Sequence, residues 1–277
     1  MQGQLEIGVG TSIVRNSIPE DEVAETYSKT AGVLKALGVL PPSAHAPYRL
    51  GEGIYCEDAM IALSSRNSRL SRFWIEDQSA LALSPKTLAG KKITIIDNED
   101  NFVRMMKHMI QAQGAVVDII SHAAYDIAKD ASDLTILGPG PGDPRNMSDP
   151  KIAKISGVCR DLLSSKKPLF CVCLGHQILC RALGFDLVKK RVSFQGKQEL
   201  INLWGDMEHV GFYNAFVGKS DRDIDGLAIS QDEATKEIHA IKGDHFVGVQ
   251  FHPESILTTN GFRIMRDILC YLLPKRI

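Results

Sequence analysis

Two short stretches of this sequence hold the residue types of a nucleophilic active site. The first is LFCVCLGHQIL, in which Cys171 and Cys173 lie at the junction between an apolar run and a helix-like pattern. A nucleophile between a strand and a helix projects outward at the positive end of the helix. Both features favour the reactive thiolate, and they single out Cys173, because Cys171 lies two residues earlier within the strand.

The second stretch is GVQFHPES, whose histidine lies 79 residues after Cys173 (252 minus 173). His252 precedes a proline, so we expect an extended backbone there, with Glu254 pointing to the same side. A carboxylate beside an imidazole fixes its tautomer and stabilises its protonated form, as in a Cys-His-Glu triad. Taken singly, each residue has a plainer reading, since free cysteines are usually buried core residues and a lone histidine is usually structural.

A third segment, LGPGPGDP, follows the apolar run DLTIL. Its glycines allow backbone amides to point at a ligand without side chains in the way. Proline and glycine also explain the segment as an ordinary tight turn. Next to a thiol and a His/Glu pair, such a loop is expected to donate an N–H to an oxyanion.

The elements that must position these residues alternate in type from Lys91 onward. Short apolar runs (KKITIID, AVVDIIS, DLTIL and PLFCVC) alternate with helical periods (NFVRMMKHMIQAQG and PKIAKISGVCRDLLSS). This alternation predicts an α/β domain with a central, mostly parallel sheet and flanking helices. The later short runs, from LVKKRVSF through VGFYNAFV to HFVGVQFHPE, predict added antiparallel strands.

The part of the chain before Lys91 has a different pattern. A strand-like opening, LEIGVGTSIV, precedes a helix-like segment that begins at Pro19 and ends near Gly38 with ordinary helix punctuation. A connector rich in proline and glycine leads to a further expected helix, YCEDAMIALSSRNSRLSRFWI. We therefore divide the chain into residues 1–38, a linker with a helix at 39–90, and the α/β domain at 91–277.

Composition limits the partners. The chain has 277 residues, and its 32 basic and 33 acidic residues give a formal net charge of -1, so neither nucleic acid nor an anionic membrane is generally attracted. The opening residues lack an export-signal pattern, and no apolar run reaches transmembrane length. The six cysteines have neither the density of a disulfide framework nor the paired CxxC spacing of a metal site. We expect a cytoplasmic protein.

Together these segments resemble the class I glutamine amidotransferases, which release ammonia from glutamine. The resemblance runs from about Lys91 to the C-terminus and is carried by IIDNEDNF, ILGPGPGDP, CVCLGHQ and GVQFHPESILT in family order and spacing. It implies that Cys173 is the nucleophile, that His252 is the base and acid, and that Glu254 orients His252. The implied glutaminase reaction uses no cofactor and no metal.

The resemblance also implies an oxyanion hole and a set of glutamine contacts. The oxyanion donors would be the amides of Gly140 and Leu174, and the glutamine contacts would come from Gln177 and from the backbone at Ala215 and Phe216. Departures from the family pattern are few. Cys171 stands where relatives usually have Gly or Ala, and FYNAF replaces the common RYHSL, which changes side-chain contacts to glutamine but leaves backbone contacts available.

Ammonia in neutral water is mostly ammonium, so the resemblance implies a synthase partner that receives it directly. The segment GVGTSIVRNSIPEDEVAETYSKTAGVLKAL resembles the final stretch of the chorismate-using synthases. In those enzymes the glycines of a GxG hold a substrate carboxylate, and glutamates on the following helix help bind Mg²⁺. The matching positions are Gly8, Gly10, Glu22, Glu25 and Lys29. A surface salt-bridge stripe would show the same helical spacing.

We therefore expect the C-terminal part of a fused synthase and amidotransferase, with Mg²⁺ needed only where a partner supplies a complete synthase domain. RNSRLSRFWIED and VGFYNAF look most like the phenazine-pathway enzymes that make 2-amino-2-desoxyisochorismate, within the anthranilate synthase superfamily. A homodimer is a further candidate assembly. Two alternatives stay open: a subunit for another ammonia-using synthetase, although the chain has no SGGxDS loop and no P-loop, and a noncatalytic relic or regulatory module.

Overall fold

The computed structural model describes residues 19–36, 38–40, 60–61, 64–65, 67–76, 86–221 and 224–273. The chain divides into two compact units, Met1–Ile61 and Ala62–Ile277. The first unit contains helix α1 (Pro19–Ala36), and the second contains the sheet and all of the predicted triad residues. None of the described helices is long and apolar enough to cross a membrane.

Helix α1 has the ends that its sequence predicts. It begins at Pro19, whose fixed φ suits the first turn of a helix. Beyond its last turn, Gly38 has a φ of 72°, and its N–H donates to the carbonyl of Lys35 at 3.0 Å. Glycine adopts this left-handed conformation without steric cost, which makes it the usual residue just past a helix end.

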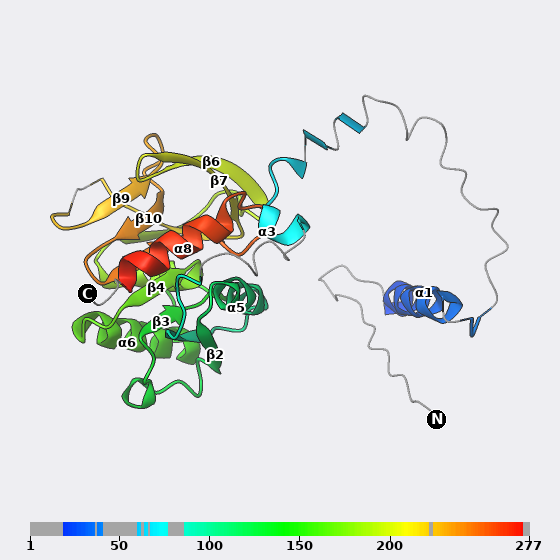
Figure 1. Ribbon diagram of the computed structural model, residues 1–277, viewed down its shortest axis with the longest axis horizontal. Coiled ribbons are helices and arrows are strands. Elements are labelled where there is room, and N and C mark those ends of the chain that lie inside the picture. Colours follow the sequence, from blue (N-terminus) through cyan, green and yellow to red (C-terminus); the bar gives the residue numbers. More distant parts are fainter. Residues whose placement is uncertain are drawn as a thin grey trace. The chain divides into compact units, whose positions relative to one another are not determined.

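A seven-stranded mixed sheet forms the centre of the second unit (Figure 1). Its strand order is β2 (Val116–Ser121), β1 (Lys92–Asp97), β3 (Leu134–Leu137), β4 (Leu169–Val172), β11 (Phe246–Val249), β10 (Ile238–Lys242) and β9 (Ala228–Gln231). The first five strands are parallel, and β10 is antiparallel to both of its neighbours. The predicted α/β fold with added antiparallel strands is confirmed.

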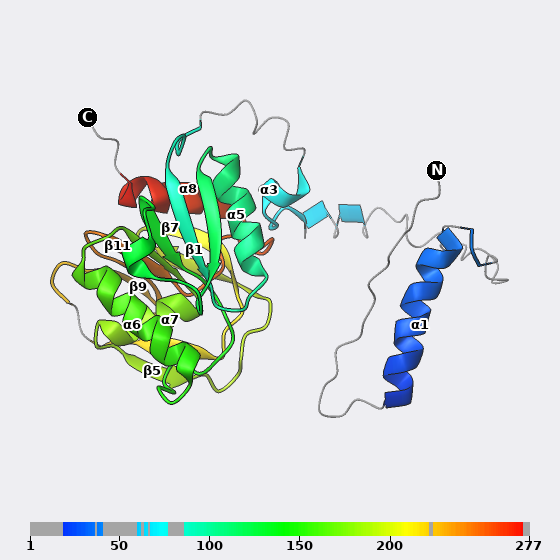
Figure 2. The same cartoon turned by 90° about the horizontal axis from the view of Figure 1, so that it is seen from below.

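Helices cover both faces of this sheet (Figure 2). One face carries α5 (Phe102–Ala112) and α8 (Gly261–Leu272), and the other carries α6 (Pro150–Ser164) and α7 (Leu174–Ala182). Because both faces are covered, β3, β4 and β11 are buried along their whole length, which explains why their sequences are continuous apolar runs.

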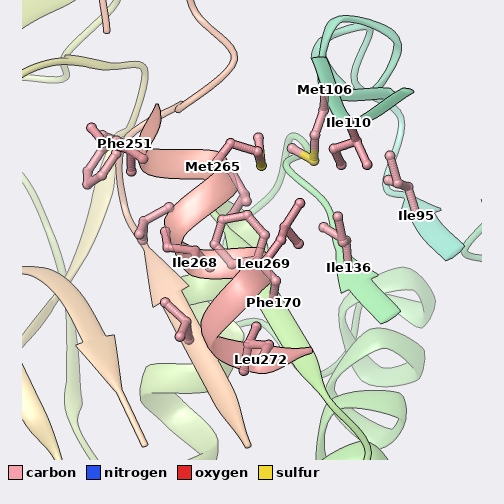
Figure 3. Packing of buried hydrophobic residues seen from close by; sticks show 14 of the residues in the cluster. Ile95, Met106, Ile110, Ile136, Phe170, Phe251, Met265, Ile268, Leu269 and Leu272 are labelled. Atoms are coloured by element: carbon pink, nitrogen blue, oxygen red, sulfur yellow. The ribbon is translucent and has the colours of Figure 1, made fainter. Parts of the chain in front are cut away.

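Figure 3 shows the core on the α5 and α8 face. Met106 and Ile110 of α5 lie opposite side chains of the central strands, and Met265 and Leu269 of α8 complete the cluster around Phe170. We did not predict α8 from the sequence, although its buried residues recur at helical spacing: Ile264, Met265, Ile268, Leu269 and Leu272. This helix matters for function because it directly follows the loop that holds the predicted catalytic histidine.

Two small antiparallel pairs flank the main sheet. They are β5 (Asp186–Lys189) with β8 (Phe216–Lys219), and β6 (Lys197–Leu203) with β7 (Asp206–Phe212). The run VGFYNAFV, expected as one strand, is instead divided between β7 and β8 at residues 213–215. The reason is tertiary: the loop after β5 crosses this break, and the N–H groups of Lys190 and Phe194 donate to the carbonyls of Ala215 and Asn214 at 2.8 and 3.0 Å.

The helix expected across residues 55–75 is only partly present. Described residues at 60–61, 64–65 and 67 are helical, a turn follows at 68–69, and a separate short helix α3 spans Arg72–Ile75. The prediction of one continuous helix was wrong because Ser71 has an extended backbone and its N–H donates to the carbonyl of Ile256 at 2.8 Å. A bond to a distant loop replaces the helical bond at this point.

Candidate active site

Cys173 occupies a strained turn between β4 and α7. Its φ of 53° and ψ of -104° are unusual for a residue with a side chain, and it forms the N-cap of α7. Its N–H donates to the carbonyl of Val249 on the neighbouring strand β11 at 2.9 Å. Gly175 allows this sharp corner, because a Cβ there would collide with the carbonyl oxygen of Leu137. The predicted elbow therefore forms, with the thiol at the positive end of a helix.

His252 and Glu254 form a buried hydrogen-bonded pair. His252 Nδ1 lies 2.8 Å from Glu254 Oε1, and both side chains are almost completely buried. The pair was predicted from an extended backbone, but the loop is a turn, in which the Ser255 N–H donates to the carbonyl of His252 at 3.1 Å. The hydroxyl of Thr258 donates to the same carbonyl. The loop is thus fixed by its own short-range bonds.

The electrostatics of His252 favour a charged imidazole. Burial by itself would lower the pKa of His252, but the Glu254 carboxylate, followed by the Cys173 sulfur, holds that pKa well above its usual range. Glu254 engages Nδ1, so Nε2 is the ring nitrogen left for the sulfur. Nε2 is buried and has no hydrogen-bond partner within the described part of the chain. Cys173 therefore lies close enough to influence the pKa of His252, but no well-formed hydrogen bond joins its sulfur to Nε2.

Two aromatic rings flank the imidazole. The ring of Phe102 lies 4.7 Å from that of His252 between centroids, and the ring of Tyr213 lies 5.1 Å from it. The hydroxyl of Tyr213 lies 3.0 Å from the hydroxyl of Ser255 in the histidine loop. These contacts limit rotation of the imidazole and shield it from water. We did not single out Phe102 or Tyr213 from the sequence, because only the fold brings them together.

The predicted oxyanion donors lie at one edge of the sheet. Gly140 follows β3 and Leu174 begins α7 directly after β4, and these two strands pair in parallel, with Leu137 opposite Cys171. A Cβ at position 140 would collide with the carbonyl oxygen of Asn98, so only glycine allows this close approach. Asn98 also donates its side-chain amide to the carbonyl of Gly138 at 2.8 Å. The glycine-rich loop is therefore held in place beside the elbow.

The predicted glutamine contacts are connected to the thiol through amides. The side-chain amide of Gln177 donates to the carbonyl of Phe216 at 2.8 Å and to Gln250 Oε1 at 3.1 Å. Gln250 in turn points its Nε2 at Cys173 Sγ, 3.7 Å away. We did not identify Gln250 from the sequence, although it precedes His252 by two residues in GVQFHPES. That spacing was the available signal for a residue on the same side of the chain.

The unusual FYNAF segment forms one wall of this site. The side-chain amide of Asn214 donates to the carbonyl of Phe216 at 2.8 Å, beside the bond from Gln177. The carbonyl of Ala215 accepts from Lys190, and the ring of Phe216 lies under the Arg145 guanidinium, 4.9 Å from its carbon. Backbone groups of Ala215 and Phe216 are thus held by named partners.

The predicted chorismate and Mg²⁺ positions are not tested by these contacts. Glu22, Glu25 and Lys29 lie within α1, and Gly8 and Gly10 lie outside the described residues. Among the residues that the structure describes, no group of three or more His, Cys, Asp or Glu side chains is arranged to hold a metal ion. The roles of these positions stay predictions.

The fold and the contacts define an α/β protein with a cysteine elbow, a buried His–Glu pair and a glycine loop at the carboxyl edge of a parallel sheet. The chain belongs to the class I glutamine amidotransferases, because the sequence profile of the family described as "Glutamine amidotransferase class-I" matches residues 94–271. The matched range contains Cys173, His252 and Glu254 and ends within α8.

Relatives extend the comparison beyond this domain. The "Anthranilate synthase, phenazine specific" of Pseudomonas chlororaphis is 40% identical over 277 residues, which cover 98% of this chain and 42% of that protein. The "Anthranilate synthase component 2" of Saccharolobus solfataricus is 30% identical over 195 residues, covering 63% of this chain and 96% of that protein. The crystal structure of a Thermotoga maritima glutamine amidotransferase has a TM-score of 0.54 and 14% identity, and it covers 66% of this chain and 96% of that one. That likeness shows the shared fold.

Proposed function

We propose that this chain is the glutaminase part of a chorismate-using synthase of the anthranilate synthase type. The observation that carries the proposal is the placement of a strained thiol, Cys173, against a buried His252–Glu254 pair in a class I amidotransferase domain. The Pseudomonas chlororaphis relative supports a phenazine-type product such as 2-amino-2-desoxyisochorismate, because the likeness includes nearly the whole chain. The chain spans 42% of that relative, so the synthase half of the reaction belongs to this proposal.

The reaction begins with transfer of the Cys173 proton to His252. The thiolate attacks the side-chain carboxamide carbon of glutamine, and the electron pair of the carbonyl moves onto oxygen. The amides of Gly140 and Leu174 hold that oxyanion. The tetrahedral intermediate collapses, the C–N bond breaks, and His252 returns the proton to the departing nitrogen, which leaves as ammonia. A glutamyl thioester remains on Cys173.

Water completes the cycle. His252, neutral again, takes a proton from a water molecule that attacks the thioester carbonyl, and the same two amides hold the second oxyanion. The C–S bond breaks, glutamate leaves, and the thiol regains its proton. Glu254 stabilises the imidazolium in both halves of the reaction, which is why its charge at 2.8 Å from Nδ1 matters.

The ammonia must reach a second site without becoming ammonium in bulk water. A chorismate-binding synthase domain or subunit is therefore the proposed partner, and the name "component 2" of the Saccharolobus solfataricus relative supports such a division of labour. Mg²⁺ would serve the synthase, and Glu22 and Glu25 of α1 would contribute to its site only alongside that partner. No step of the glutaminase reaction uses the metal.

Covalent labelling tests the glutaminase directly. The chain is incubated with a glutamine-mimicking chloroketone, its intact mass is measured, and the labelled cysteine is mapped by peptide analysis. We expect one adduct, on Cys173, and slower labelling when glutamine is present. The exposed Cys270 of α8 is the matched control for nonspecific alkylation, and a Cys270→Ala variant removes it. Adducts spread over several cysteines, or labelling that glutamine does not slow, would contradict the assignment.

A turnover measurement separates this proposal from a noncatalytic relic. Glutamate release is followed with and without chorismate, and with a synthase partner added. Hydrolysis that increases when the partner and chorismate are present supports ammonia supply to a synthase. No hydrolysis under any of these conditions, together with an unlabelled Cys173, would mean that the chain is a regulatory or relic module.

A further inference from the structure

A short segment before the amidotransferase domain contacts the histidine loop directly. Residues 69–75, which include α3, precede the range that the family profile matches. They lie against residues 254–259, the part of the loop that carries Glu254. In Figures 1 and 2, α3 lies beside α5 at the edge of the sheet domain.

The central contact is made by Trp74. Its indole N–H donates to the backbone carbonyl of Glu254 at 2.8 Å, across 180 positions of sequence. Glu254 is fully buried, so this bond holds the peptide unit of the very residue whose carboxylate engages His252. A buried carbonyl that loses its donor is costly, and the loop would have to move to satisfy it.

Two further direct bonds, and a bridge through Gln198 of β6, connect the segment to the same loop. The N–H of Ser71 donates to the carbonyl of Ile256 at 2.8 Å. The carbonyl of Arg69 accepts from the hydroxyl of Thr259 and from the side-chain amide of Gln198. That amide of Gln198 also donates to the carbonyl of Leu257, next to Ile256, at 2.7 Å. The segment thus holds the loop at Glu254, Ile256 and Thr259, and Gln198 joins it to Leu257.

Aromatic packing anchors the segment to the domain. Phe73 is only 4% exposed and stacks on Phe262 of α8, with 4.9 Å between ring centroids and 11° between ring planes. Trp74 stacks on His108 of α5 at 5.7 Å and meets Phe73 edge-on at 4.8 Å. The indole is therefore held between an anchored neighbour and a helix of the domain, in the orientation that its hydrogen bond needs.

We propose that Trp74 is a positioning residue for the glutaminase, and that residues 69–75 form a clamp that keeps Glu254 aligned with His252. The inference rests on the proposed function, since alignment of this pair matters only where the pair takes part in glutamine hydrolysis. The clamp also gives the preceding chain a physical route to the triad.

The chain supplies its own control. It contains two tryptophans, and Trp204, in the turn between β6 and β7, makes the same kind of bond from its indole N–H to the carbonyl of Ala228 at 3.1 Å. Its ring also packs against the Lys242 ammonium, 4.8 Å away, so both indoles have a hydrogen bond and a packing partner. Only Trp74 contacts the histidine loop. Trp74→Phe and Trp204→Phe therefore remove equivalent groups with different expected consequences.

The experiment compares kcat, KM for glutamine, the pH profile and the thermal unfolding midpoint of the three proteins. For Trp74→Phe we expect kcat to fall about tenfold with KM within about twofold, because small displacements of a catalytic group cost rate rather than binding. The pH at which the rate falls on the alkaline side of the profile (the alkaline limb) should be lower in Trp74→Phe, since a loosened Glu254 stabilises the imidazolium less. The groups that face His252 are Glu254, Cys173 and the rings of Phe102 and Tyr213, so this limb reports the pair.

For Trp204→Phe we expect wild-type kcat and an unmoved limb, whatever the change in unfolding midpoint. Alkylation of Cys173 by the chloroketone across the same pH range gives a second readout that does not need turnover. A Trp74→Phe variant with wild-type rate and limb, or equal losses in both variants, would overturn the clamp alone. A wild-type chain that neither hydrolyses glutamine nor alkylates at Cys173 would overturn the proposed function and the clamp together.

Discussion

Two cysteine–histidine pairs belong to opposite faces of the same sheet, and their chemistry differs. Cys173 packs in the core beneath α5 and α8 and faces His252. Cys180 packs in the core beneath α6 and α7, where its Sγ lies 3.4 Å from Nε2 of His176, one turn earlier on α7. Burial lowers the pKa of His176 to about 3 and raises that of the Cys180 thiol, so this second pair is neutral.

The difference shows that closeness of a thiol and an imidazole does not by itself make a catalytic pair. Both histidines are buried, and burial disfavours the charged imidazole in each. Only His252 has a carboxylate on its other ring nitrogen, and the attraction to Glu254 outweighs the cost of burial. The backbone at Ile238 and Gly248 acts to raise the pKa of His176, but burial outweighs it. The third group decides which pair can exchange a proton.

Backbone geometry makes the second difference. Along β4, Leu169 and Cys171 face the α6 and α7 core, whereas Phe170 and Val172 face the other core. Strict alternation would place the thiol of Cys173 beside that of Cys171. The φ of 53° breaks the alternation and turns Cys173 to the side where His252 lies. Strain at one residue therefore places the Cys173 thiol in a different core from the Cys171 thiol.

Replacing each thiol by alanine tests this separation most strongly. Cys173→Ala should abolish glutaminase activity, because no nucleophile remains to form the thioester. Cys171→Ala and Cys180→Ala should largely retain activity, since burial raises the pKa of both thiols and neither faces the site. Glutamate release and the unfolding midpoint are measured for all three. Equal activity losses in Cys171→Ala and Cys173→Ala would show that the wrong sulfur was chosen or that the elbow was misread.

Removing the charge of Glu254 tests the role of the third group. Glu254→Gln keeps the size of the side chain, and we expect kcat to fall by about 10⁴-fold, as when a triad loses its carboxylate. The raised pKa of His252 means that its protonated form stabilises the fold below its unfolded value, and that this contribution disappears as pH rises through the folded-state value. Without the carboxylate that value falls, so the alkaline limb of activity should move to lower pH.

The matched control for this change is Glu237→Gln, because Glu237 pairs with Lys190 away from the histidine loop. Its pH–rate profile should follow that of the wild type. If Glu254→Gln kept the wild-type rate and limb, the contrast between His252 and His176 would need another cause.

Much of this fold follows from local sequence patterns. The strands β1 to β4 and the helices α5, α6 and α7 were predicted because their periodicity is local and uninterrupted. The helix across residues 55–75 was not predicted correctly, because a bond from Ser71 to the distant Ile256 decides the backbone there. The break at 213–215 has the same kind of cause, since it depends on the loop at 190–196. A local sequence pattern does not indicate such long-range hydrogen bonds.

The candidate site also contains residues that the sequence indicates and residues that only the tertiary fold reveals. Cys173, His252 and Glu254 were identified from motifs, and the structure brings them together. Trp74 was not identified, because its contacts join segments that only the tertiary fold makes adjacent. Gln250 was missed although its spacing of two residues from His252 was an available signal. Motifs name the residues whose chemistry is special. The residues that hold them in place are ordinary types whose importance comes from position.

The last prediction concerns the stability of the fold and rests on the neutral His176–Cys180 pair beneath α6 and α7. The unfolded chain binds a proton at His176 below about pH 6.5, whereas the folded chain does not until about pH 3. The folded state therefore loses stability as pH falls through this window, by about 3 kcal/mol at about pH 4. His176→Gln should remove that part of the slope, measured as unfolding free energy in urea at several pH values. A His176→Gln slope equal to that of the wild type would contradict a buried neutral histidine.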